Sequence, residues 1–182
     1  MRVIVLATVA SILSACHVAV GDGGPPNLDV LKQCERYLNG KSVDFPFGGP
    51  SVGVIAPGDI PQESKLRVSV NLPRGRAIRF LSDEFEVYFP GESSPLRDRA
   101  VILDGQFEPA SSEIVEVFRS GDTLQNESDE EQWYFLSVFA IEDLPSAFVL
   151  RFPNIEVSGT LSRIPDVAFK FFADRNGLGI CD

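Results

Sequence analysis

The sequence predicts a mainly β fold: an antiparallel β-sandwich, or a partly closed barrel, with one short N-terminal helix. After residue 40, apolar residues recur at every second position over several stretches, which is the period of a strand with one buried face. Pairs of turn-forming residues interrupt these stretches at short intervals. Hydrophobic residues make up 44% of the chain and 14 of its 182 residues are Phe, so we expect a packed core. Roughly eight to ten short strands in a single domain over residues 27–182 fit this pattern.

Residues 1–15 have the composition of a cleaved export signal. Arg2 supplies a positive charge, residues 3–13 carry none, and Ser14 and Ala15 are the small residues that a signal peptidase requires. An apolar run of about 11 residues is too short to span a hydrocarbon layer about 30 Å thick. We therefore expect this segment to be removed.

The four residues Leu13-Ser14-Ala15-Cys16 resemble the lipobox of bacterial lipoproteins, in which a leucine and two small residues precede a cysteine. The resemblance covers only residues 1–16. It implies that Cys16 carries a diacylglyceryl group on its thiol and a third acyl chain on its amino group, and several chains anchor a protein stably. In Gram-negative lipoproteins an Asp after the cysteine favours the inner membrane. Here His17 follows, so the resemblance implies an anchor in the outer membrane, on its periplasmic face. The alternative is an ordinary secretory signal with Cys16 retained.

A tether and a short helix are expected between this anchor and the strands. Residues 16–26 form the lipidated N-terminus and a tether that ends in glycines and two prolines. Asn27 is a suitable N-cap, and Gly40 is a suitable helix stop. Apolar residues recur near helical spacing at Leu28, Leu31, Cys34 and Leu38. The spacing predicts a helix at about residues 28–39.

The three cysteines predict one disulfide. If lipidation consumes Cys16, Cys34 and Cys181 remain as an even pair in an oxidising compartment. Their bond would join the start of the folded body to its end. Two free buried thiols are one alternative, and a metal pair is another, although zinc would need further Cys or His ligands.

The clearest predicted strand is Lys65–Leu72, where Leu and Val alternate with polar residues, so that one face is dry and the other wet. Residues 85–89 and 167–172 alternate in the same way. Residues 133–141, beginning with Trp133, are apolar at both sets of positions, which is typical of a central strand covered on two faces. Asp104-Gly105 predicts a tight hairpin. Further turns are predicted at Pro90-Gly91, Gly121-Asp122, Ser158-Gly159 and Asn176-Gly177.

The charge balance narrows the range of partners. With 16 basic and 26 acidic residues, the chain has a formal net charge of −10. Such a surface repels phosphate backbones, so no nucleic-acid partner is expected. Contact with the membrane is expected through the lipid anchor alone. A basic protein partner is compatible with this charge.

No catalytic residue, cofactor or metal site is predicted. The single histidine, His17, follows the expected lipidation site and cannot serve a Ser-His-Asp or Cys-His site in the domain, nor a His-ligated zinc site. A carboxylate pair of the glycosidase type remains conceivable, with Asp83 and Glu84 as an example. In a strand, however, these neighbours would face opposite sides.

The segment from residue 122 to residue 131 is a candidate acidic contact loop. Its carboxylates are Asp122, Glu127, Asp129, Glu130 and Glu131. They could form a binding lip for a basic partner, hold calcium, or simply be a solvated loop. The spacing lacks the ligand order of an EF-hand.

Phe45 and Phe47, which flank a proline and precede two glycines, form a candidate aromatic contact patch. One interpretation is a core lid, because Phe is usually buried. The other is an exposed grip for a glycan or a peptide.

Together these features predict a non-catalytic lipoprotein of the cell envelope that acts as a binding or adaptor module. The alternative is an inhibitor or immunity lipoprotein that neutralises a basic toxin or hydrolase. A carboxylate-dependent glycan hydrolase is a third hypothesis.

Overall fold

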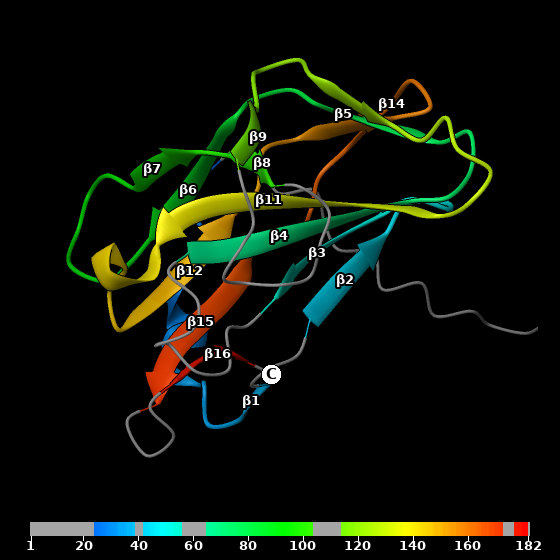
Figure 1. The fold of residues 1–182 in the computed structure, drawn as a ribbon. Helices are drawn as coiled ribbons and strands as arrows, with labels where there is room; N and C mark the ends of the chain where they lie inside the picture. Colours follow the sequence, from blue (N-terminus) through cyan, green and yellow to red (C-terminus); the bar gives the residue numbers. More distant parts are fainter. Residues whose placement is uncertain (1–23, 39–41, 56–64, 104–113, 173–176, 182) are drawn as a thin grey trace, which may run out of the picture.

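The computed structural model describes residues 24–38, 42–55, 65–103, 114–172 and 177–181. Within these ranges the chain forms sixteen strands, more than the sequence predicted, and two short 3-10 helices (Figure 1). All strand pairings are antiparallel, and each of the three sheets has two open edges among the described strands. The structure is therefore mainly β and open-edged, which confirms the predicted sandwich over the partly closed barrel.

The three sheets are named sheets I to III. Sheet I has the order β1 (Tyr37–Leu38), β16 (Gly177–Cys181), β15 (Val167–Phe172), β12 (Ala147–Arg151), β6 (Glu84–Tyr88) and β7 (Leu96–Arg99). Sheet II has the order β2 (Ser42–Pro46), β3 (Ser51–Ile55), β4 (Lys65–Leu72), β11 (Gln132–Ala140), β8 (Val101–Leu103) and β9 (Ile114–Val117). Sheet III has the order β10 (Thr123–Gln125), β5 (Ala77–Phe80), β13 (Ile155–Val157) and β14 (Thr160–Ser162).

One core joins the sheets. Leu66 and Val68 of β4 and Phe169 of β15 are fully buried in the same cluster as Phe80 of β5. In Figure 1, β15 of sheet I runs steeply across the direction of β4 and β11 of sheet II. The period-two prediction for residues 65–72 is confirmed, because β4 has these bounds and its apolar face is buried.

Two expectations for the other face of sheet II were wrong. Ser69 and Asn71, on the predicted wet face of β4, are only 3% and 5% exposed. Trp133 was expected in the core, but it is 43% exposed. In β11 the inward positions belong to Leu136 and Val138, and the alternation of a strand places Trp133 on the opposite face.

The N-terminal helix is shorter than predicted. It is a 3-10 helix, η1 (Leu28–Lys32), and the chain then extends into β1, which pairs with β16. The expected N-cap is present, since the side chain of Asn27 accepts a hydrogen bond from the backbone N–H of Asp29 at 3.0 Å. The helix cannot continue to residue 39 because Cys34 is bonded to β16, which draws the chain into strand pairing.

The turn predictions had mixed outcomes. Ser158 and Gly159 both have positive φ, 53° and 77°, and connect β13 to β14 in a tight hairpin. Asp104-Gly105 and Asn176 lie outside the described residues. The last residue of β8, Leu103, pairs with Ile114 of β9. The second 3-10 helix, η2 (Ile141–Asp143), follows β11. Neither described helix has the length and apolar character needed to cross a bilayer.

Candidate functional site

The predicted lipidation site, Cys16, and the neighbouring His17 lie within residues 1–23, outside the described residues. Lipidation of Cys16 therefore stays a prediction. The described chain begins at Gly24, close to the point where the predicted tether meets the domain.

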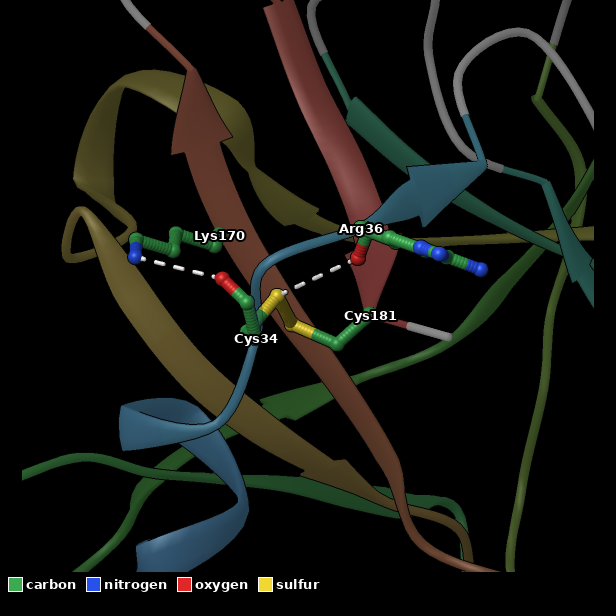
Figure 2. Close-up of a disulfide and its surroundings, with 4 residues drawn as sticks. All are labelled: Cys34, Arg36, Lys170 and Cys181. Atoms are coloured by element: carbon green, nitrogen blue, oxygen red, sulfur yellow. Dashed lines mark hydrogen bonds between the residues drawn. A yellow bond between two sulfur atoms is a disulfide. The ribbon is translucent and has the colours of Figure 1, made fainter.

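The predicted disulfide is present. Cys34 and Cys181 are bonded, with their Cα atoms 5.3 Å apart, across a sequence separation of 147 residues (Figure 2). Figure 2 also shows the Nζ of Lys170 directed at the carbonyl oxygen of Cys34, to which it donates a hydrogen bond at 3.4 Å. The Sγ of Cys34 lies 3.7 Å from the carbonyl oxygen of Arg36. This is a contact rather than a hydrogen bond, because a disulfide sulfur carries no proton. These contacts fix η1 and β1 to the end of β16.

A second attachment of the N-terminal segment was not foreseen from the sequence. Arg151, at the end of β12, donates hydrogen bonds to both carboxylate oxygens of Asp166, at 3.1 and 2.9 Å, and to the carbonyl oxygen of Gly24 at 2.7 Å. Its guanidinium carbon lies 5.0 Å from the ring centroid of Tyr88. The bonds to Asp166 raise the pKa of Arg151. The side chain of Arg151 is only 12% exposed. The partly buried ion pair between Arg151 and Asp166 therefore holds the backbone at Gly24, where the described chain begins, against the sheet.

The candidate acidic loop is organised by a buried amide rather than by its carboxylates. Asn126 is fully buried, and its Nδ2 donates to the carbonyl oxygens of Leu72 and Glu130, both at 2.7 Å. Its Oδ1 accepts from the backbone N–H and the Oγ of Ser128 at 2.8 and 2.7 Å. No sequence pattern pointed to this role, because Asn126 is one of several polar residues in the segment.

Two of the predicted acidic residues, Asp122 and Glu127, line a groove of about 510 Å³. Gln125 and Tyr134 also line it. The hydroxyl of Tyr134 donates to the carbonyl oxygen of Gln125 at 2.7 Å, and burial, together with the charge of Glu127, raises the pKa of Tyr134. Asp122 accepts a hydrogen bond from the backbone N–H of Arg119 at 2.7 Å, and neither Asp122 nor Glu127 makes an ion pair with a described cation, so the groove carries negative charge.

The remaining acidic residues do not join this groove. Asp129 pairs with Arg74 at 2.7 Å, and Glu130 and Glu131 are exposed. Within the described part of the chain no group of three His, Cys, Asp or Glu side chains could hold a metal ion. The structure therefore offers nothing in support of the calcium alternative.

The carboxylate pair considered for glycan hydrolysis has a structural explanation. Asp83 and Glu84 both approach Arg99 of β7, at 3.6 and 3.9 Å. One arginine thus neutralises both carboxylates at the edge of sheet I, and no observation favours a catalytic role for them.

The candidate aromatic patch lies beside a second cleft. Phe45 belongs to β2, and its ring is half-buried at 6.4 Å from the ring of Phe152. Phe47, just beyond the strand, is also half-buried against the core. The side chains are neither a closed lid nor a free patch, because each packs on the core while remaining partly accessible.

This cleft has a volume of about 690 Å³ and lies between sheets I and II, next to η1. Its apolar lining includes Val30 of η1, Val43 and Phe45 of β2, Val167 of β15 and Ile180 of β16. These residues are distant in sequence and meet only because β2 and β16 lie near the same side of the sandwich. Composition and spacing could not have identified the cleft.

Compared with protein-family models, with curated proteins and with solved structures, the chain matches none of them.

Proposed function

We propose that the protein is a lipid-anchored protein of the bacterial cell envelope and that its β-sandwich acts by binding a partner rather than by catalysis. The observation that carries the proposal is the sequence Leu13-Ser14-Ala15-Cys16 directly after an uncharged apolar run. Acylation of Cys16 would hold the domain at the outer membrane, facing the periplasm.

The disulfide supports export. Disulfides persist in oxidising compartments and are rare in the bacterial cytosol, so the Cys34–Cys181 bond fits a protein that leaves the cytosol. The same bond and the Arg151–Gly24 contact fix the chain from residue 24 onward to the body. If Cys16 is acylated, the eight residues 16–23 could span about 27 Å at most between the bilayer and the domain.

The experiment is the intact mass of the full-length chain expressed in a Gram-negative bacterium and extracted from membranes with detergent. We expect a chain that begins at Cys16 and carries three acyl groups. Cys16→Ser should abolish the added mass and release the protein from the membrane, whereas Cys34→Ser, the matched cysteine control, should leave acylation intact. An unmodified Cys16 in a chain that retains its leader would contradict the proposal.

The outer-membrane assignment has a separate test. In the density-separated membranes of the same cells, the wild-type chain should sediment with the outer membrane. His17→Asp should shift it to the inner membrane, while His17→Asn should not. A wild-type chain that sediments with the inner membrane would contradict the assignment without affecting the anchor.

A second candidate function is inhibition of a basic toxin or hydrolase. The groove that exposes Asp122 and Glu127 without a described cation favours it, because it attracts positive charge. A basic peptidoglycan hydrolase should be inhibited by the wild-type chain, less so as salt increases. Inhibition should fall with Asp122→Asn combined with Glu127→Gln, but not with Asp29→Asn, which removes an exposed charge from η1. Equal inhibition by all variants would show that the groove is not the site that binds the hydrolase.

A further inference from the structure

We infer that the edge of β2 that no described strand covers is the docking site for an extended segment of a partner protein, with apolar side chains on one face and Lys or Arg on the other. The inference rests on the proposed binding function and specifies the chemistry of the partner. The segment would add a strand to sheet II and fill the cleft between the sheets.

β2 is the edge strand best suited to pair with another chain. Among the described strands its partner is β3, through five consecutive residue pairs from Ser42↔Ile55 to Pro46↔Ser51. The other edges are shorter or more protected. β1 has two residues, β10 and β14 have three each, and β9, the other edge of sheet II, has four. β7 is shielded by charge, because Arg97 and Arg99 pair with carboxylates of or beside β6.

The cleft beside β2 has the shape that alternate side chains of an added strand require. Val43 and Phe45 are two residues apart and both line the cleft, opposite Val30 and Ile180. A strand paired with β2 would place every second side chain on that same side. Its main-chain groups would pair with β2, and its apolar side chains would enter a volume of about 690 Å³, which lies within the usual range of binding pockets.

The opposite face of β2 supplies charge complementarity. Asp44 is exposed between Val43 and Phe45, and its carboxylate lies over Gly53 of β3, where it accepts a hydrogen bond from Ser42 Oγ at 3.1 Å. It makes no ion pair with a described cation. A residue directly across from Asp44 on an added strand would share this face, and a Lys or Arg there would form a favourable cross-strand pair. The net charge of −10 favours the same sign of partner.

Binding would be tested with three end-blocked synthetic peptides. The first is Val-Lys-Val-Lys-Val-Lys-Val, the second has Glu in place of every Lys, and the third is the first with N-methyl groups on alternate amides, made in both registers. The protein is the full chain in lipid nanodiscs, or in buffer if it carries no acyl groups. The readout is fluorescence anisotropy of the labelled peptide. Peptide binding does not require acylation, so failure here and failure of the anchor are separate results.

We expect the Lys peptide to bind and the Glu peptide to bind more weakly. At least one of the N-methylated registers should lose binding, because methyl groups remove the amide protons that face β2. Asp44→Lys should weaken the Lys peptide by about fivefold to tenfold and strengthen the Glu peptide, since a single cross-strand pair changes from attractive to repulsive. Val43→Lys should block both peptides by placing a charge in the cleft.

The matched control is Leu161→Lys on β14, another edge strand, where Leu161 is 65% exposed. It should leave peptide binding unchanged.

Asp44→Lys alters an exposed side chain, so it tests the inference even if Val43→Lys prevents folding. Binding of both N-methylated peptides as tight as that of the unmethylated Lys peptide, or loss of binding with Leu161→Lys alone, would overturn the inference. A wild-type dimer that Asp44→Lys dissociates would overturn it in favour of a second copy of the chain. Tighter peptide binding after removal of residues 16–23 would also overturn the inference, because it would mean that this segment of the same chain is the natural occupant of the site.

Discussion

Asn126 is fully buried although it lies in a segment dominated by charged and polar residues. Its four side-chain hydrogen bonds join the end of β4, the segment after β10 and the approach to β11. The shape of the acidic groove therefore depends on an uncharged side chain. The sequence predicted the carboxylates that line this groove. Burial of the Asn126 amide depends on how its own loop meets the end of β4, 54 residues away, and sequence spacing does not report this contact.

Replacement of Asn126 by Ala should lower the free energy of unfolding by about 2–4 kcal/mol, because the buried carbonyl oxygen of Leu72 loses this donor, the other three side-chain bonds are lost and a cavity remains. Equilibrium unfolding in urea measures this change. Ser128→Ala is the matched control, since it removes hydroxyl bonds at a more exposed position and should cost about 1 kcal/mol or less. Equal losses in the two variants would show that Asn126 does not organise the loop.

Tyr134 should make stability depend on alkaline pH. Burial, followed by the charge of Glu127, raises its pKa in the folded state above the unfolded value of about 10. The folded state then holds the phenol proton more tightly, so this contribution is complete below pH 10 and is lost as pH rises through the folded pKa. Tyr134→Phe should flatten the fall in urea midpoint above pH 10. Some fall should remain, because burial and Glu86 raise the pKa of Tyr88 as well.

Glu127→Gln provides the control for this assignment. It should lower the pKa of Tyr134 only in part, since burial is the larger cause and persists in the variant. Titration of the tyrosine ring carbons by NMR separates the two effects. A Tyr134 pKa at or below the ordinary value in the wild-type chain would contradict the argument.

At the scale of elements, strands were predictable where side-chain alternation and burial coincide. β4 and β15 have the predicted bounds because their apolar residues face a single core. The helix prediction failed after Lys32, since helical spacing of a few apolar residues could not compete with the Cys34 bond and pairing with β16. Trp133 was misplaced because an apolar side chain on the outer face of a sheet has the same sequence pattern as one in the core.

The β2–β3 hairpin depends on a glycine, which gives a prediction at the scale of the element. A Cβ at Gly53 would overlap the Asp44 carboxylate and lie 2.8 Å from the backbone carbonyl oxygen of Val43. Gly53→Ala should therefore displace β2 and lower the free energy of unfolding by about 1–3 kcal/mol in urea. Adding Asp44→Ala should not restore stability, because the clash with the backbone remains. Full recovery in the double variant would place the strain in the side chain alone.

At the scale of the molecule, the sequence predicted the disulfide and two acidic residues of one groove, but neither the β2 cleft nor the Arg151 attachment. Each cysteine has only one partner left once Cys16 is assigned elsewhere, so counting was sufficient. Arg151 and Gly24 are 127 residues apart and could have had many partners. Contacts of this kind follow from the packing of whole sheets, which local pattern does not determine.

The Cys34–Cys181 bond should be the largest single contribution to the stability of the whole molecule. It closes a loop with a sequence separation of 147 residues and joins the N-terminal segment to the last strand. In the chain-entropy model, a loop of that length restricts the unfolded chain by about 5 kcal/mol. Reduction of the wild-type chain should therefore lower the free energy of unfolding in urea by roughly that amount, and Cys34→Ser with Cys181→Ser should reproduce the loss. Cys16→Ser, which leaves the bond intact, should match the oxidised wild-type chain. A reduced chain as stable as the oxidised one would mean that sheet pairing alone holds the two ends together.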